Sequence, residues 1–204
     1  MPTLSPSLDF ARQLDSRDPL ASYRDQFVIT DPDLIYLDGN SLGMMPKIAQ
    51  ERARQIVEEE WGRDLIRGWN KGWWDAPARV GDKIGGLIGA APGQTIVSDT
   101  VSLNLFKLAT SALTLQPDRT KIITDTFNFP SDLYILQGIV NLFDGESPSP
   151  RGRGARGEGK YPILRIGPAD NDITPDLAAL ESAIDENTAL VTLSHVLFKS
   201  GYLY

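Results

Sequence analysis

The stretch KIITDTFNFPSDLYILQGIVNLF, residues 121–143, changes its hydrophobic period part-way along. The run Lys121–Thr126 is short and rich in β-branched residues, so it predicts a strand. The apolar positions of Asp132–Phe143 recur as on one face of a helix. A strand followed directly by a helix is the repeating unit of a sheet with parallel strands, so the fold depends on whether the unit recurs.

The same alternation continues on both sides of this stretch. We expect further strands and helices in the order Thr95–Ser98, Leu103–Leu115, Tyr161–Ile166, Thr174–Ile184 and Ala189–Phe198. This βαβαβαβ order predicts an α/β fold with a mostly parallel sheet and flanking helices. In such sheets functional groups gather at the carboxyl ends of the strands.

The residues before this region predict helices without strands. Two short helical stretches begin the chain, and an amphipathic helix is expected from Pro46 to Trp61. Pro77 opens a further helix that Gly89 ends. We therefore divide the chain into an N-terminal arm with a helical segment, residues 1–75, and an incomplete α/β domain, residues 76–204.

One segment interrupts the α/β order. Residues 146–160 contain Ser-Pro-Ser-Pro followed by an Arg-Gly repeat and have no apolar period, which predicts a mobile surface insertion. The alternative interpretation is that its three arginines bind a phosphate group or a nucleic acid. A solvated insertion is favoured because the chain as a whole is acidic.

Composition excludes several classes of function. Twenty basic against 27 acidic side chains leave a net charge of −7, which disfavours nucleic acid and anionic membranes as partners. No cysteine and a single histidine disfavour disulfides and a metal site. No apolar run approaches the roughly 18 residues of a membrane span, and the start lacks a signal-peptide pattern. We expect a cytoplasmic protein with a small-molecule substrate.

Two strand-end clusters are candidates for ligand binding. Hydroxyl residues in Ser98–Leu105 open a helix, where free amides suit a phosphate, although an ordinary N-cap at Thr100 or Ser102 is the alternative. The string Phe127–Asp132 sets an aromatic ring beside a carboxylate, as a flat cationic heterocycle requires. Its alternative is that Asp132 or Ser131 caps the helix while Phe129 fills the core.

A third cluster ends the last predicted strand. Ser194 offers a hydrogen bond to a ligand, whereas the lone His195 is more often a structural residue. Lys199 lies in an expected exposed turn, which lacks the desolvation that activates a Schiff-base lysine. Upstream, Trp69 and Trp73 either line an aromatic pocket or pack in the core.

Taken in order, five strings resemble kynureninase: Leu37–Gly43, Leu65–Trp73, Asp99–Leu105, Phe127–Tyr134 and Leu193–Tyr202. The resemblance covers residues 27–204 apart from the insertion. It implies the aspartate-aminotransferase-like fold, fold type I of the pyridoxal-phosphate enzymes. The predicted α/β order agrees with that fold.

The resemblance also implies cofactor and substrate residues. In the family pattern, residues that bind pyridoxal 5'-phosphate fall at Val101, Ser102, Phe129, Pro130, Ser131, Asp132 and Ser194. Val101 and Ser102 correspond to the phosphate cradle, and Phe129 to the ring-stacking residue. Asp132 corresponds to the residue near the ring nitrogen, and Ser194 to a hydroxyl at the phenolic oxygen. The substrate pocket corresponds to Ser41 and Trp69, and an aromatic residue at Trp69 implies kynurenine rather than 3-hydroxykynurenine as substrate.

The implied reaction is hydrolysis of L-kynurenine to anthranilate and L-alanine by a homodimer, in tryptophan catabolism and NAD biosynthesis. The family's Schiff-base lysine and its Asp-x-x-His string are expected after Tyr204. This chain is therefore expected to be an N-terminal fragment that contains no catalytic residue and is inactive alone. Two alternatives stay open: a noncatalytic protein that binds a phosphate ligand or a partner, and another fold-type-I enzyme such as a cysteine desulfurase relative.

Overall fold

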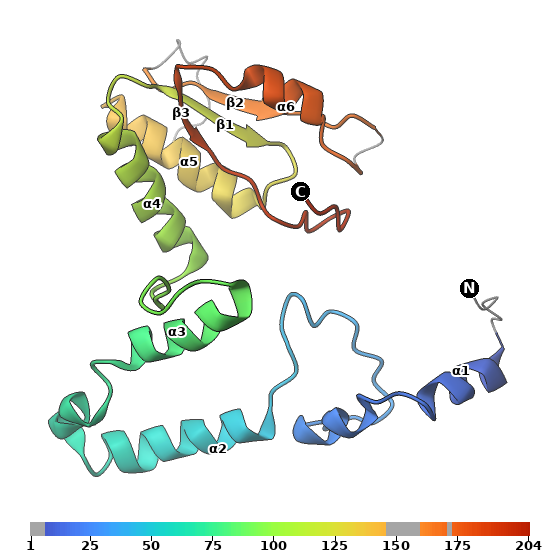
Figure 1. Cartoon of the computed structure of the whole chain (residues 1–204). Coiled ribbons are helices and arrows are strands. Elements are labelled where there is room, and N and C mark those ends of the chain that lie inside the picture. The colour runs from blue at the N-terminus through green and yellow to red at the C-terminus, as the bar shows by residue number, and fades with distance from the viewer. Residues whose placement is uncertain (1–6, 146–159, 171–172) are drawn as a thin grey trace, which may run out of the picture. The chain divides into compact units, whose positions relative to one another are not determined.

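The computed structural model describes residues 7–145, 160–170 and 173–204. Their contacts divide the chain into two units, one up to Ile96 and one from Val97 to Tyr204 (Figure 1). The predicted domain boundary after residue 75 precedes the last helix of the first unit and stays a prediction. The predicted insertion, residues 146–160, lies outside the described residues except for Lys160.

The second unit is built on a parallel sheet. Its strands are β1 (Lys121–Asp125), β2 (Ile163–Ile166) and β3 (Thr188–Val191), in the order β2-β1-β3. In the register, Ile123 pairs with Leu164 on one side and with Val191 on the other. The predicted parallel α/β fold is confirmed.

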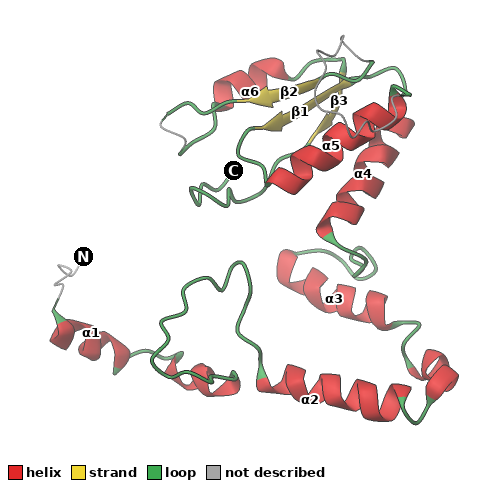
Figure 2. Ribbon diagram, turned by 180° about the vertical axis from the view of Figure 1, so that it is seen from behind, coloured by secondary structure: helices red, strands yellow, loops and turns green. Residues whose placement is uncertain are grey.

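Helices cover both faces of this sheet. They are α4 (Val101–Leu115), α5 (Pro130–Phe143) and α6 (Leu177–Ala183). Figure 2 shows α4 and α5 together on one side of the strands and α6 on the other. All three fall within or next to the predicted helical ranges.

The core of the second unit follows from the alternation of strand side chains. Ile122 and Ile123 are adjacent on β1, so they point to opposite faces, and both are fully buried. Ile122 packs with Leu113 of α4 and Leu136 of α5, whereas Ile123 packs with Leu180 of α6. The central strand β1 therefore contributes to the hydrophobic core on both faces of the sheet.

Two predicted strands differ from the structure. Thr95–Ser98 is not a strand, because Thr95 packs closely against Gly81 and Gly85 of the preceding helix. A Cβ added to Gly81 would lie 2.1 Å from the Thr95 carbonyl oxygen. The strand expected at Ala189–Phe198 ends at Val191. The Thr192 N–H still donates to the Ile123 carbonyl oxygen of β1, but the Thr192 carbonyl oxygen accepts from the side chain of Asn128 in place of a strand N–H.

The described residues of the first unit form helices in α-, 3-10 and π-helical form and one isolated antiparallel bridge between Phe27 and Pro46. The helices are α1 (Leu8–Asp15), η1 (Ala21–Gln26), α2 (Lys47–Gln55), η2 (Ile56–Trp61), η3 (Leu65–Lys71) and α3 (Ala76–Ile88). The predicted helix from Pro46 to Trp61 is present, with a π-helical second half. Gly89 ends α3, as predicted, and it adopts the left-handed conformation, φ 78°. Among the described residues, no helix has the length and apolar character needed to cross a lipid bilayer.

Candidate functional site

The carboxyl edge of the sheet is organised around Asp125, the last residue of β1. Its side chain is fully buried, and both of its oxygens accept hydrogen bonds. The backbone N–H of Phe127 donates to Oδ1 at 2.7 Å, and the Tyr204 hydroxyl donates to Oδ2 at 2.6 Å. Burial raises the pKa of the Tyr204 phenol above its ordinary value, and the bond to Asp125 raises it further. The first residues after β1 are thereby tied to the C-terminal segment.

Asn128 joins the ends of β1 and β3. Its side chain is 4% exposed. Nδ2 donates to Thr124 Oγ1 at 2.8 Å and to the Thr192 carbonyl oxygen at 3.2 Å, and Oδ1 accepts from Ser194 Oγ at 2.6 Å. The residues that follow β1 and those that follow β3 are therefore held together at one edge of the sheet.

Phe129 lies beside this bonded group with its ring partly free. The residue is 52% exposed, so the alternative that Phe129 fills the core is wrong. Its ring meets the ring of Phe198 edge to face, with centroids 5.0 Å apart. Such a half-exposed aromatic ring can take a flat ligand on its open surface.

The first turn of α5 carries the carboxylate of Asp132. Phe129 precedes the helix and no side chain caps it, so the alternative capping roles of Ser131 and Asp132 are wrong. Pro130 occupies the start of the helix, where its missing N–H costs nothing. Ser131 Oγ lies 3.5 Å from Asp132 Oδ1, and in the described part of the chain no cation pairs with Asp132. The carboxylate is therefore free to meet a cationic ligand.

The start of α4 combines a cap with exposed amides. Thr100 Oγ1 accepts from the backbone N–H of Leu103 at 3.3 Å, so Thr100 is the N-cap, as the alternative had it. Val101 and Ser102 occupy the first turn, where backbone N–H groups have no acceptor within the helix. The Lys107 ammonium binds Asp99, and this bond lowers the pKa of the Asp99 carboxyl. The cap does not exclude an anion at the remaining first-turn amides.

The structure brings only some of the predicted cofactor and substrate residues close together. Ser194 lies after β3 rather than on a strand, and it is bonded to Asn128 next to Phe129. Among the described residues no direct hydrogen bond links Val101 or Ser102 to that group. Ser41 and Trp69 belong to the first unit, and the units are not placed relative to one another. Sequence reasoning missed Asn128, because a buried amide between two strand ends has no local signature.

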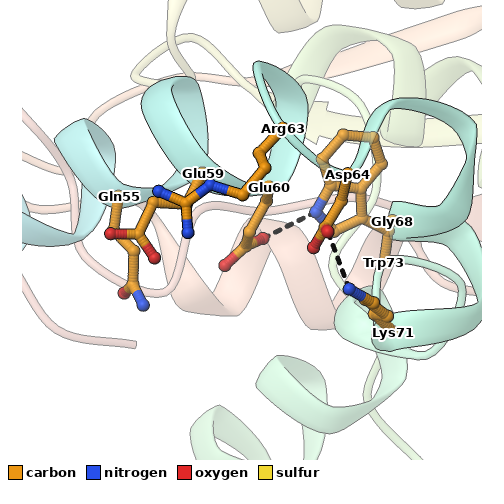
Figure 3. A pocket seen from close by; sticks show the side chains of 8 residues that line it. All are labelled: Gln55, Glu59, Glu60, Arg63, Asp64, Gly68, Lys71 and Trp73. Atoms are coloured by element: carbon orange, nitrogen blue, oxygen red, sulfur yellow. Dashed lines mark hydrogen bonds and ion pairs between the residues drawn. The ribbon is translucent and has the colours of Figure 1, made fainter.

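The first unit contains a polar pocket of about 420 Å³, drawn in Figure 3. It is lined by Gln55, Glu59, Glu60, Arg63, Asp64, Gly68, Lys71 and Trp73. Trp73 Nε1 donates to Glu60 Oε2 at 2.7 Å, and Lys71 Nζ binds Asp64 Oδ1 at 2.7 Å. The pKa of the Glu60 carboxyl is lowered, first by its bond to Arg52 and then by the bond from Trp73. The bond from Lys71 lowers the pKa of the Asp64 carboxyl.

Trp69 lies outside this lining. Its ring meets those of Trp73 and Trp74 edge to face, with centroids 6.2 and 6.1 Å apart, and it is 47% exposed. Of the two predicted tryptophans, Trp73 is therefore half-buried in the wall of the pocket, whereas Trp69 contacts the ring of Trp73 without lining the pocket. Ser41 lies exposed in a turn, where its backbone N–H donates to the Asp38 carbonyl at 3.1 Å.

Known proteins resemble this chain over nearly its whole length. A kynureninase of Burkholderia pseudomallei (strain K96243) is 41% identical over 199 residues, which make up 95% of the chain. A kynureninase of Pseudomonas fluorescens is 40% identical over 196 residues, or 94% of the chain. The chain is a homologue of the kynureninases. It spans 42% of the length of each of these kynureninases. No protein-family model matches it.

A solved structure supports the fold of this kynureninase homologue. It is a lysine-to-alanine mutant of C-DES with glycine covalently linked to its pyridoxal-phosphate cofactor. The two folds agree with a TM-score of 0.62 at 19% identity, over 88% of this chain and 42% of C-DES. At that identity the likeness concerns the fold, and it confirms the predicted fold of the pyridoxal-phosphate enzymes.

The bond between Tyr204 and Asp125 is expected to stabilise the second unit. Tyr204→Phe leaves a buried carboxylate oxygen without its donor, so we expect the free energy of unfolding to fall by about 1–3 kcal/mol. Because the folded pKa of Tyr204 is raised, this contribution is complete below the unfolded pKa of about 10 and declines as the pH rises above it. Urea unfolding of both proteins at neutral and alkaline pH measures the difference.

The control for this substitution is Tyr134→Phe, because Tyr134 is an exposed residue on α5. It is expected to leave the stability within about 0.5 kcal/mol of the original. An equal loss in both variants, or a Tyr204 effect that grows at alkaline pH, would contradict the assigned role of the hydroxyl.

Proposed function

We propose that this chain supplies part of the cofactor-binding domain of a kynureninase, which hydrolyses L-kynurenine to anthranilate and L-alanine. The observation that carries the proposal is the 41% identity to a kynureninase over 95% of the chain. The cofactor named for C-DES supports pyridoxal 5'-phosphate as the ligand. When bound, this cofactor supplies an electron sink for carbanions on the amino acid.

Features of the carboxyl edge support this ligand. A flat, cationic ring needs an aromatic surface and an anion, and Phe129 is half exposed while Asp132 has no cationic partner in the described chain. A phosphate needs unpaired donors, which the first turn of α4 offers at Val101 and Ser102. The residues present therefore fit the cofactor.

Each of these residues is assigned one role in binding the cofactor. Phe129 stacks on the ring, and the Asp132 carboxylate keeps the ring nitrogen protonated, because a nearby anion favours the charged form. Pro130 and Ser131 form the turn that presents Asp132 at the start of α5. Ser194 meets the phenolic oxygen.

The substrate is proposed to meet Ser41 and Trp69. Trp69 is 47% exposed and its ring lies beside that of Trp74, so it can contact the aromatic ring of kynurenine. Selectivity for kynurenine over its 3-hydroxy form is part of this proposal. So are a homodimer and a cytoplasmic location.

No Schiff-base lysine is proposed among these 204 residues. Lys199, the lysine nearest in sequence to Ser194, is exposed in a turn with its ammonium 5.7 Å from the centre of the Phe198 ring. Borohydride reduction after incubation with pyridoxal phosphate traps a Schiff base, and intact mass then reports it. We expect no stoichiometric adduct on this chain. Complete labelling of one lysine, such as Lys199, would contradict the assignment.

The activity is tested on the natural full-length protein. We expect it to release anthranilate from L-kynurenine, measured by anthranilate fluorescence, and to form one reduced lysine adduct after borohydride treatment. An adduct without anthranilate would favour another fold-type-I enzyme. Neither adduct nor anthranilate would favour a noncatalytic binding protein.

A further inference from the structure

We propose that Asn128 is a positioning residue of the cofactor site, which orients Ser194 so that its hydroxyl accepts a hydrogen bond from a ligand and does not donate one. This inference rests on the proposed function. It concerns the direction of one hydrogen bond, and it follows from how the Asn128 side chain is bonded.

The orientation of the Asn128 amide is determined by its partners. The carbonyl oxygen of Thr192 can only accept a hydrogen bond, so the amide nitrogen of Asn128 must face it, at 3.2 Å. The same nitrogen donates to Thr124 Oγ1 at 2.8 Å, which occupies its second hydrogen. The amide oxygen therefore faces Ser194, and an exchange of the amide oxygen and nitrogen would set two acceptors against each other.

The bonding of Ser194 follows from this orientation. A serine hydroxyl has one hydrogen, and at 2.6 Å from Asn128 Oδ1 that hydrogen is donated to the amide oxygen. Ser194 Oγ then has only lone pairs to offer a second partner. A ligand atom that meets Ser194 must itself carry a hydrogen, as the protonated phenol of pyridoxal phosphate does and its ionised form does not.

Burial makes this arrangement costly to change. Asn128 is 4% exposed, so an amide atom that lost its partner would stay unpaired and away from water. Asn128 also directly precedes Phe129, whose ring is proposed to stack on the cofactor. One side chain thus positions both the hydroxyl and the loop that carries the aromatic ring.

The test compares two ligands in three proteins. The ligands are pyridoxal phosphate and its analogue with a methyl group on the phenolic oxygen, which still accepts a hydrogen bond but no longer donates one. The proteins are the natural full-length protein, its Ser194→Ala variant and its Asn128→Ala variant. Equilibrium dialysis gives each dissociation constant, and the ratio of the two constants is the preference of one protein. Comparing this preference between proteins cancels the steric cost of the methyl group that they share.

We expect the unsubstituted protein to prefer pyridoxal phosphate over the methylated analogue. Ser194→Ala should lower this preference about tenfold, because the acceptor is removed. Asn128→Ala should lower it by a similar factor although Ser194 is present, because the freed hydroxyl can then donate to either ligand. A purely structural role of Asn128 would lower the stability and leave the preference unchanged.

The outcomes separate this inference from the proposed function. Binding of pyridoxal phosphate with the same preference in all three proteins would overturn the role of Asn128 and leave the function intact. Absence of binding to the unsubstituted protein would overturn both. If Asn128→Ala does not fold, Ser194→Ala decides the question: an unchanged preference would mean that Ser194 does not accept from the ligand.

Discussion

Leu136→Ala is expected to lower the free energy of unfolding of the Val97–Tyr204 unit by about 2–5 kcal/mol. Leu136 is 0% exposed on α5 and packs with Ile122 of β1 and Leu113 of α4. Truncation removes buried methyl groups and leaves a cavity that the parallel sheet and two helices close only in part. Urea unfolding followed by circular dichroism measures the loss.

The matched control lies on the same helix. Leu142 is 61% exposed, so Leu142→Ala removes little buried surface and should change the stability by less than about 0.5 kcal/mol. Equal losses at Leu136 and Leu142 would contradict the assignment of the core to the face of α5 that meets β1.

Gly81→Ala is expected to destabilise the Met1–Ile96 unit. The added Cβ would lie 2.1 Å from the Thr95 carbonyl oxygen and 2.8 Å from Ile96 Cα, which are backbone atoms and cannot rotate away. Overpacking of this kind costs about 1–3 kcal/mol or more. The fluorescence of the tryptophans at Trp61–Trp74 follows unfolding of this unit during urea titration.

Gly86→Ala on the same helix is the control. A Cβ at Gly86 meets nothing within 4 Å, and alanine favours a helix over glycine by up to about 1 kcal/mol. We therefore expect Gly86→Ala to stabilise the unit while Gly81→Ala destabilises it. Stabilisation by both would mean that the segment around Thr95 does not pack on α3.

Most helices and the central strand could be predicted because their signals are local. Pro77 and Gly89 bracket α3, and the β-branched run at Lys121–Thr126 marks β1. The length of β3 was wrong because a strand continues only while it has a partner. At Thr192 the N–H still donates to the Ile123 carbonyl oxygen of β1, but the Thr192 carbonyl oxygen is bound by the Asn128 side chain, 64 residues away in sequence.

The candidate site was predicted in its residues but not in its bonding. Phe129 and Ser194 could be singled out from their positions after strands and from a family resemblance. Nothing in their local sequence indicates that Asn128 joins their loops, since that bond depends on the order β2-β1-β3. The bond from Tyr204 to Asp125 escaped prediction for the same reason.

The central place of β1 has a consequence for synthesis on the ribosome. Ile122 pairs with Ile163 and then with Leu190, so the middle strand is made first and both of its neighbours are made later. Parallel pairing also requires a crossover before each new strand, which delays contact formation. Both apolar faces of β1 therefore lack one neighbouring strand until Val191 has been made, and during that time they are open to aggregation.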